Sequence, residues 1–420
     1  MSSLRAPFTS KDAATIAQPS LIRWLDRFWN PVAILAWTVA LSAIVGKIVA
    51  SPERVTNVNR YLKAGRAWIE GSPLYIYTPN KGFVYGPFSA VCYALASYLP
   101  DVWTRILWCL LSAALLLGGM WAMMTSGPFS QLPARRRGLA FLLVLPLALG
   151  NFDSAQANAF LVGLIMIAFA AASAERWTIA AIALAVAVHW KVYPVVAGLL
   201  LILLFPRGFS WRFVLAVVIT GLIPFLFQNA SYVIDQYRLW YDTRTADNRL
   251  DYSLTIAPRD LWFILVQAAG LPISQTVYRL IQAVVGLAIA TYCLWGRVND
   301  LPKEQLLAGT FSLVCAWMTL LGPASELYTY LLVAPAVAFE MVAAFSKRGD
   351  AVSRSLVLAA FLFLLAAILR VGFFPRYENA YALSLQPLGA LFFLVYACRK
   401  HFGEVFNRPR NTGDSALSST

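Results

Sequence analysis

Long apolar runs separated by short polar joints make up most of this chain between Pro31 and Cys398. A helix needs roughly 17–25 mainly apolar residues to cross the hydrocarbon of a bilayer. Runs near that length are Pro31–Ala50, Phe83–Leu99, Trp103–Thr125, Phe213–Gln228, Thr276–Trp295, Leu306–Leu321, Leu327–Phe345, Ser355–Phe374 and Ala382–Cys398. Shorter or interrupted runs are Gly138–Leu149, Ala159–Ala174, Thr178–Val188 and Tyr193–Phe205. The pattern predicts an all-α, polytopic transmembrane helical bundle of about 11–13 membrane segments, some of them short or re-entrant.

Composition agrees with that class and excludes several others. The 420 residues are 60% hydrophobic and 13% charged, which is too much apolar surface for one soluble core. The five cysteines stand in apolar runs without CxxC spacing, so we interpret them as packing residues. With two histidines and no Asp-x-Asp pair, glycine-rich phosphate loop or Walker lysine, we expect no metal site, no cofactor and no hydrolysis of ATP.

Basic residues predict the orientation in the membrane. The tail 1–30 carries Arg5, Lys11, Arg23 and Arg27, and the positive-inside rule places it in the cytoplasm. The other clusters, interpreted as cytoplasmic edge charges rather than a nucleic-acid surface, are Arg135–Arg137, Arg207 with Arg212, Lys347 with Arg348, and the tail 399–420. These charges account for the net charge of +14 and leave 31–398 as the membrane domain.

Strict alternation creates one conflict in this topology. If both Phe83–Leu99 and Trp103–Thr125 cross fully, Arg135–Arg137 falls on the side opposite the N-terminal tail. One of these two runs is therefore predicted to be partial or re-entrant.

A polar turn from Gly150 to Asn158 lies between two apolar runs. Its polar side chains include Asn151, Asp153, Gln156 and Asn158. Unpaired polar groups at bilayer depth cost kilocalories each, so such a cluster predicts a binding site unless it is a hydrated loop tip. The sequence leaves both interpretations open.

Two further polar joints interrupt the apolar runs. His189-Trp190-Lys191-Val192-Tyr193-Pro194 divides the stretch from Thr178 to Phe205 and predicts two short helices that meet at a charged apex. Lys191 there needs an anion, for which a lipid phosphate is the obvious candidate, or else snorkels to the interface. The joint from Gly322 to Tyr330 carries Glu326 and Tyr328. Glu340 and Arg279 stand singly near helix ends and are interpreted as structural or snorkelling residues.

Two segments are long enough to do chemistry outside the membrane. In Ser51–Gly82, apolar residues recur at helical spacing from Asn57 to Glu70, which predicts a surface helix with Asn57 and Arg60 on its polar side. Asn229–Asp260 mixes charges and aromatics, a pattern that suits a carbohydrate site and also an ordinary solvated loop. The residues of interest in the second segment are Asp247, Arg249 and Arg259.

The order of these motifs resembles glycosyltransferase family 87. The motifs are Gly-x-Pro-Leu-Tyr (Gly71 to Tyr75), an aromatic-x-Tyr-x-Pro re-entry (Phe83 to Pro87), Gly150 with Gln156 and Asn158, Lys-x-Tyr-Pro (Lys191 to Pro194) and Gly-Pro-x-x-Glu (Gly322 to Glu326). The resemblance covers about Asn57 to Tyr330. It implies the GT-C architecture and a bacterial inner-membrane enzyme that transfers mannose from a polyprenyl-phosphate donor to a glycolipid or glycan acceptor, on the extracytoplasmic face.

The resemblance also directs the assignment of site residues. In the family an aspartate of the first extracytoplasmic loop is thought to be the base, and Asn57, which cannot accept a proton, stands where we align it. We therefore expect the base at Asp153 or, second, at Glu326. The expected binding residues are Asn57, Arg60, Asn151, Gln156, Asn158, His189, Lys191, Tyr193, Asp247, Arg249, Arg259 and Tyr328.

Two other functions stay open on the sequence alone. A lipid or sugar transporter or flippase also has polar breaks in its membrane helices, but we find no matched half-segments here. An inactive scaffold of a polysaccharide assembly complex would tolerate the missing aspartate. Membrane lipids are expected partners in every case, and the sequence does not indicate an oligomeric state.

Overall fold

The computed structural model describes residues 26–75, 82–245, 252–254, 257–322, 325–346, 350–373 and 379–406. Its regular structure in these ranges is helical, with no strand, so the predicted all-α membrane class is confirmed. Among the residues that the structure describes, five helices are long and apolar enough to cross a membrane: α2 (Trp29–Ala50), α5 (Asp101–Thr125), α12 (Gln275–Val298), the segment Leu327–Ser346 and α15 (Ala351–Phe373). The segment Leu327–Ser346 comprises η5 (Leu327–Leu332) and α14 (Ala334–Ser346).

The remaining helices are shorter or less apolar. They are α3 (Asn57–Glu70), α4 (Pro87–Ala96), η1 (Ala134–Arg136), α6 (Arg137–Asp153), α7 (Asn158–Ser173), α8 (Trp177–Trp190), α9 (Val195–Leu204), α10 (Ser210–Leu222), η2 (Ile223–Leu226), α11 (Ala230–Thr245), η4 (Phe263–Ala268), α13 (Lys303–Leu320), α16 (Ala380–Leu383) and α17 (Leu385–Phe406). The part 399–406 of the expected tail thus continues α17.

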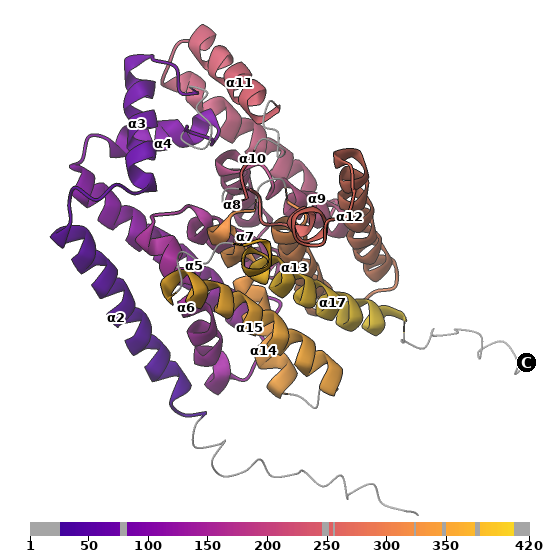
Figure 1. The fold of residues 1–420 in the computed structure, drawn as a ribbon. Coiled ribbons are helices and arrows are strands. Elements are labelled where there is room, and N and C mark those ends of the chain that lie inside the picture. The colour runs from indigo at the N-terminus through magenta and orange to yellow at the C-terminus, as the bar shows by residue number, and fades with distance from the viewer. Residues whose placement is uncertain are drawn as a thin grey trace, which may run out of the picture.

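α7 lies at the centre of the bundle (Figure 1) and is buried along nearly its whole length. It packs tightly on α5 because both helices carry a glycine at the contact. A Cβ on Gly163 would come within 2.5 Å of the Leu115 backbone, and one on Gly119 within 2.8 Å of the Gly163 oxygen. Small residues let membrane helices approach this closely. α2 runs along the outside and exposes apolar side chains such as Ile34.

One end of the bundle gathers basic residues, and we call it the basic face, defined by Arg136, Arg207 and Arg297. Arg136 pairs with Asp26 at 3.0 Å and also donates to the Phe345 carbonyl. The face thus joins the start of α2, the start of α6 and the end of α14.

The short α4 resolves the topology conflict. Its ten residues extend about 15 Å, half of the roughly 30 Å of hydrocarbon. It packs on α3, where a Cβ on Gly65 would meet the Tyr93 backbone at 2.5 Å. One of two runs was predicted to be partial, and the structure identifies it as Phe83–Leu99. The starts of α2 and α6 lie on the same face. There Asn30 donates to the Ala134 carbonyl and accepts from the Gly138 N–H at 2.7 Å.

The opposite end, the site face, is defined by Asp153, Lys191 and Tyr328. α3, α4 and α11 lie together over it (Figure 1). The Leu74 N–H donates to Gln236 Oε1 at 2.9 Å, and Tyr232 donates to the Ser72 carbonyl at 2.7 Å. The hydrogen-bonded parts of the two segments expected outside the membrane, residues 72–74 and 232–236, therefore lie on the same side of the molecule. Residues 230–245 form a helix where we expected a loop, because this stretch contains no glycine or proline to end it.

Labelling of single cysteines tests this arrangement. In a background without Cys92 and Cys398, we expect cysteines at the exposed positions Lys63 and Asp235 to react with an impermeant maleimide from one side of the membrane. A cysteine at Arg135 should react only from the other side. Labelling of Lys63 and Arg135 from the same side would contradict the two faces described here.

Candidate active site

The polar turn of the sequence begins one helical turn later than expected. α6 continues through Gly150 to Asp153, and the chain turns at Ser154–Ala157 before α7 begins. Ala155 takes a left-handed conformation, with φ of 52°, although it is not glycine. Two hydrogen bonds hold it: Trp108 Nε1 donates to the Ala155 carbonyl at 3.3 Å, and the Gln156 N–H donates to the Asn151 carbonyl at 2.8 Å.

A relay of side-chain amides joins the three polar joints of the sequence. Lys191 Nζ donates to Asn158 Oδ1 at 2.8 Å, and Asn158 Nδ2 donates to Asn151 Oδ1 at 3.3 Å. Asn151 Nδ2 then donates to the Tyr328 carbonyl at 3.2 Å. Both asparagines are buried, so each amide satisfies a group that would otherwise be unpaired in the bundle. The turn is therefore a connected polar centre and not a hydrated loop tip.

Tyrosines surround the ammonium of Lys191. Its Nζ lies 5.9 Å from the centroid of the Tyr85 ring and 5.8 Å from that of Tyr193. The Tyr85 hydroxyl lies 3.0 Å from that of Tyr61, whereas the buried Tyr193 hydroxyl has no hydrogen-bond partner among the described residues. Among the residues that the structure describes, no carboxylate forms an ion pair with Lys191. The site thus presents a cation and a free hydroxyl.

Glu326 stands at the edge of this group. It is the N-cap of η5, where a reciprocal capping box with Thr329 fixes it, and its side chain is exposed. Two residues later in the same element, the Tyr328 carbonyl accepts from Asn151 Nδ2, so Glu326 lies close in sequence to the end of the amide relay.

Asp153 is held by two cations, Lys47 and Arg54. Arg54 binds both of its oxygens, at 2.7 and 2.6 Å, and Lys47 binds one at 2.7 Å. Asp153 lies beyond the apolar run 138–149, and its hydrogen bond to Arg54 lowers its pKa to about 2. A carboxylate with both oxygens occupied and so low a pKa accepts protons poorly. This geometry favours a structural role, in which Asp153 ties the end of α2 and the α2–α3 connection to α6.

Asn57 completes the link between α3 and the turn. It is the first residue of α3, and both its backbone N–H and its Nδ2 donate to the Ser154 carbonyl, at 3.3 and 2.9 Å. A carboxylate here would have no proton to donate to that carbonyl. Asn57 therefore serves the packing of α3 on the turn. Arg60, one helical turn on, is exposed.

Other predicted site residues have different surroundings. His189 packs against Phe88, and its Nε2 lies 2.8 Å from the Val217 carbonyl. Tyr328 accepts from Ser154 Oγ at 3.0 Å, and its ring covers Gly150, where a Cβ would come within 2.7 Å.

Four further residues were predicted to belong to the site: Gln156, Arg259, Asp247 and Arg249. The Gln156 side chain is partly exposed and forms no hydrogen bond within the described ranges. Arg259 connects to the 322–330 joint through its N–H, which donates to the Ser325 carbonyl at 2.7 Å. Asp247 and Arg249 lie outside the described residues.

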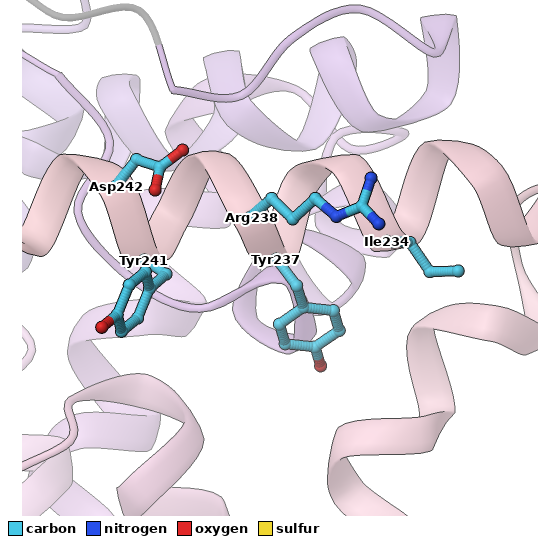
Figure 2. A pocket seen from close by; sticks show the side chains of 5 residues that line it. All are labelled: Ile234, Tyr237, Arg238, Tyr241 and Asp242. Atoms are coloured by element: carbon cyan, nitrogen blue, oxygen red, sulfur yellow. The ribbon is translucent and has the colours of Figure 1, made fainter.

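A groove of about 490 Å³ runs along α11 on the site face. Figure 2 shows Tyr237 and Tyr241 pointing to the same side of that helix, one turn apart. Arg238 and Asp242 also line the groove. Trp240 Nε1 donates to the Val84 carbonyl at 3.3 Å, so α11 contacts the chain next to Tyr85. The aromatic and charged residues of this segment thus form one surface beside the polar centre.

Sequence reasoning missed two groups of residues. The Tyr61–Tyr85 pair had a signal, because Tyr61 falls on the apolar side of the predicted surface helix. The second group surrounds Glu340, which is fully buried and bound by Tyr396 at 2.9 Å, Lys400 at 2.6 Å and His401 at 3.0 Å. His401 falls in the range 399–420 that the sequence assigns to the basic tail, and no local pattern indicates that α17 carries it into the bundle. Within the described ranges, no cluster of metal-ligating side chains occurs.

Comparison with known protein families adds an independent finding. A model of glycosyltransferase family 87 matches residues 83–323, more than half of the 420-residue chain. The matched range begins before α4 and includes Asn151, Asn158 and Lys191, and it ends before Glu326 and Tyr328. A search of curated proteins found no match.

The ion pairs of Asp153 predict a pH-dependent contribution to stability. Because the pKa of Asp153 falls from 3.8 to about 2 on folding, its stabilisation is complete above about pH 4 and is lost as the pH falls through about 2. We expect Asp153→Asn to cost roughly 1–2 kcal/mol near pH 7, between the values of exposed and buried pairs. Thermal unfolding of both proteins over a pH series measures this.

The control is Asp235→Asn, which removes an exposed pair with Arg238 and should change little. A difference between wild type and Asp153→Asn that grows as the pH falls from 4 would contradict the assignment.

Proposed function

Because the chain belongs to glycosyltransferase family 87, we propose that it transfers a hexose, mannose by the family resemblance, from a polyprenyl-phosphate donor to a glycolipid or polysaccharide acceptor. The observation that carries the proposal is the environment of Lys191. A lysine held by an amide and two tyrosine rings, with no carboxylate paired to it among the described residues, is a site for an anion. The phosphate of a lipid-linked sugar is an anion that reaches such a place from the bilayer.

The depth of Lys191 supports this choice of ligand. α9 has ten residues and extends about 15 Å, so the α8–α9 pair is too short for its apex to reach across the roughly 30 Å of hydrocarbon. The apex is therefore recessed below the surface at the site face. A donor anchored by a polyprenyl chain brings its phosphate to that depth, whereas a soluble nucleotide sugar does not.

Glu326 is the base in this proposal. Its carboxylate takes the proton of an acceptor hydroxyl, whose oxygen attacks the anomeric carbon of the donor. The bond from that carbon to the phosphate oxygen breaks, polyprenyl phosphate leaves, and the configuration inverts. Lys191 stabilises the charge that develops on the leaving phosphate. Glu326 is preferred to Asp153 because its side chain is exposed and lacks the two cations that bind Asp153.

The groove on α11 is proposed to bind the acceptor. Tyrosine rings stack on the C–H faces of sugars, while Arg238 and Asp242 offer hydrogen bonds to hydroxyls. The charge bias favours a cytoplasmic basic face, so the site face is proposed to be extracytoplasmic, in the inner membrane of a bacterium.

Transfer from labelled polyprenyl-phosphate mannose to a glycolipid extract tests the function with purified protein. We expect Glu326→Gln to lower turnover by roughly 10²–10⁴-fold while donor binding stays nearly unchanged, because a general base acts on the acceptor proton and not on the phosphate. Asp153→Asn should retain most activity under conditions in which it remains folded. No transfer by wild type with several sugars would contradict the function, and an active Glu326→Gln would contradict the base.

The acceptor groove predicts a change in one kinetic constant. Tyr241 is 65% exposed and contributes a ring to the groove, so Tyr241→Ala should raise the KM for acceptor by several-fold with little effect on that for donor. Tyr98→Ala is the matched control, since Tyr98 is 76% exposed and lies outside the groove. Equal acceptor KM values for the two variants would remove the groove from the acceptor site.

A further inference from the structure

A second hollow, of about 370 Å³, lies on the basic face. The start of α8, the α9–α10 connection and the end of α12 meet there, at the opposite end of the bundle from Glu326. Trp177, Phe205, Arg207 and Arg297 contribute to its wall. Its size is in the range of small-ligand sites, which is about 300–1,000 Å³.

The apolar part of the wall is firmly packed. The rings of Trp177 and Phe205 lie 4.9 Å apart between centroids. The indole of Trp177 rests on the backbone of Gly208, where a Cβ would come within 2.8 Å of its Cε2 atom. A tryptophan at the end of a membrane helix, as Trp177 is at the start of α8, is typical of the membrane–water interface.

The polar part of the wall is cationic. Arg297 Nη1 donates to the Leu203 carbonyl at 2.9 Å, which fixes this guanidinium beside the exposed Arg207. The neighbouring carboxylate of Glu175 pairs with Lys303 at 2.9 Å. Among the described residues, only the two arginines contribute charge to the lining. The hollow is therefore complementary to an anion that also has an apolar part.

We propose that this hollow binds the headgroup phosphate of an anionic phospholipid from the leaflet at the basic face. Two arginines suit the phosphate, since guanidinium donates hydrogen bonds in pairs to its oxygens. Exposed apolar side chains on the adjoining helices, Ile179 on α8 and Leu294 on α12, lie where acyl chains would run. Basic pockets between membrane helices on the cytoplasmic side bind such headgroups.

The position of the hollow suggests a role for the bound lipid. The start of α8 and the end of α9 line the hollow, and the other ends of these two helices meet at Lys191. A bound headgroup bridges Arg207 and Arg297 and so fixes this pair against α12. This role is independent of the proposed transfer reaction.

Native mass spectrometry of the full-length protein tests the proposal, with phosphatidylglycerol, phosphatidylcholine and inorganic phosphate as probes. We expect wild type to retain phosphatidylglycerol in preference to phosphatidylcholine. Arg207→Ala combined with Arg297→Ala should weaken phosphatidylglycerol binding roughly tenfold or more. The control combines Arg66→Ala with Arg279→Ala. It also removes two exposed arginines, and Arg279 lies at the opposite end of α12 from Arg297. This variant should still retain phosphatidylglycerol in preference to phosphatidylcholine.

Each other outcome overturns the proposal. Equal loss in the two double variants would reduce the effect to overall charge, and equal retention of both lipids by wild type would exclude headgroup selection. Binding of inorganic phosphate that the Arg207/Arg297 variant loses, without selective lipid binding, would assign the hollow to a soluble phosphate compound. Because the readout is binding, failure here leaves the transfer assay untouched.

Discussion

Polar groups buried among membrane helices must find partners, and the rest of this structure depends on how Lys191, Asn158 and Asn151 do so. The chain of hydrogen bonds from Lys191 through the two asparagines to the Tyr328 carbonyl joins the α8–α9 apex, the α6–α7 turn and η5. Because each amide both donates and accepts, the loss of one member leaves its neighbour unpaired. The three joints are therefore held as one unit, with the ammonium group still able to face an anion.

Around this unit, electrostatic contacts place the elements that cover the site. Asp153 uses both carboxylate oxygens on Arg54 and Lys47, which holds the α2–α3 connection on α6. Asn57 then seats α3 on the same turn through the Ser154 carbonyl. These contacts support the proposal that Asp153 has a positioning role and that the exposed Glu326 is the base.

The fold class and the three polar joints could be predicted because they follow from local pattern. The length of each apolar run predicts a membrane helix, and a group of several polar residues between two such runs marks a joint. Charge alternation predicted that one of the runs Phe83–Leu99 and Trp103–Thr125 is partial, and the ten-residue α4 identifies the first of them as the partial one. The helix at 230–245 was missed because its mixed polarity gives no clear periodicity, although it contains no glycine or proline.

The partners of the charged residues could not be predicted, since they come from distant parts of the chain. Asp153 meets Lys47 and Arg54 about a hundred residues away, and Glu340 meets His401 across 61. The sequence alone therefore does not show that Asp153, and not Glu326, is paired with two cations.

The most direct test of the account is whether Lys191 binds the phosphate of the donor lipid. The measurement compares the affinity of the protein for a polyprenyl phosphate and for the matching polyprenol. We expect wild type to prefer the phosphate, Lys191→Ala to lose that preference by roughly 10- to 100-fold, and Lys191→Arg to keep part of it, because the charge remains while its geometry changes. Lys63→Ala, on the exposed side of α3, should match wild type. An alanine variant at position 191 that still prefers the phosphate as strongly as wild type would contradict the account.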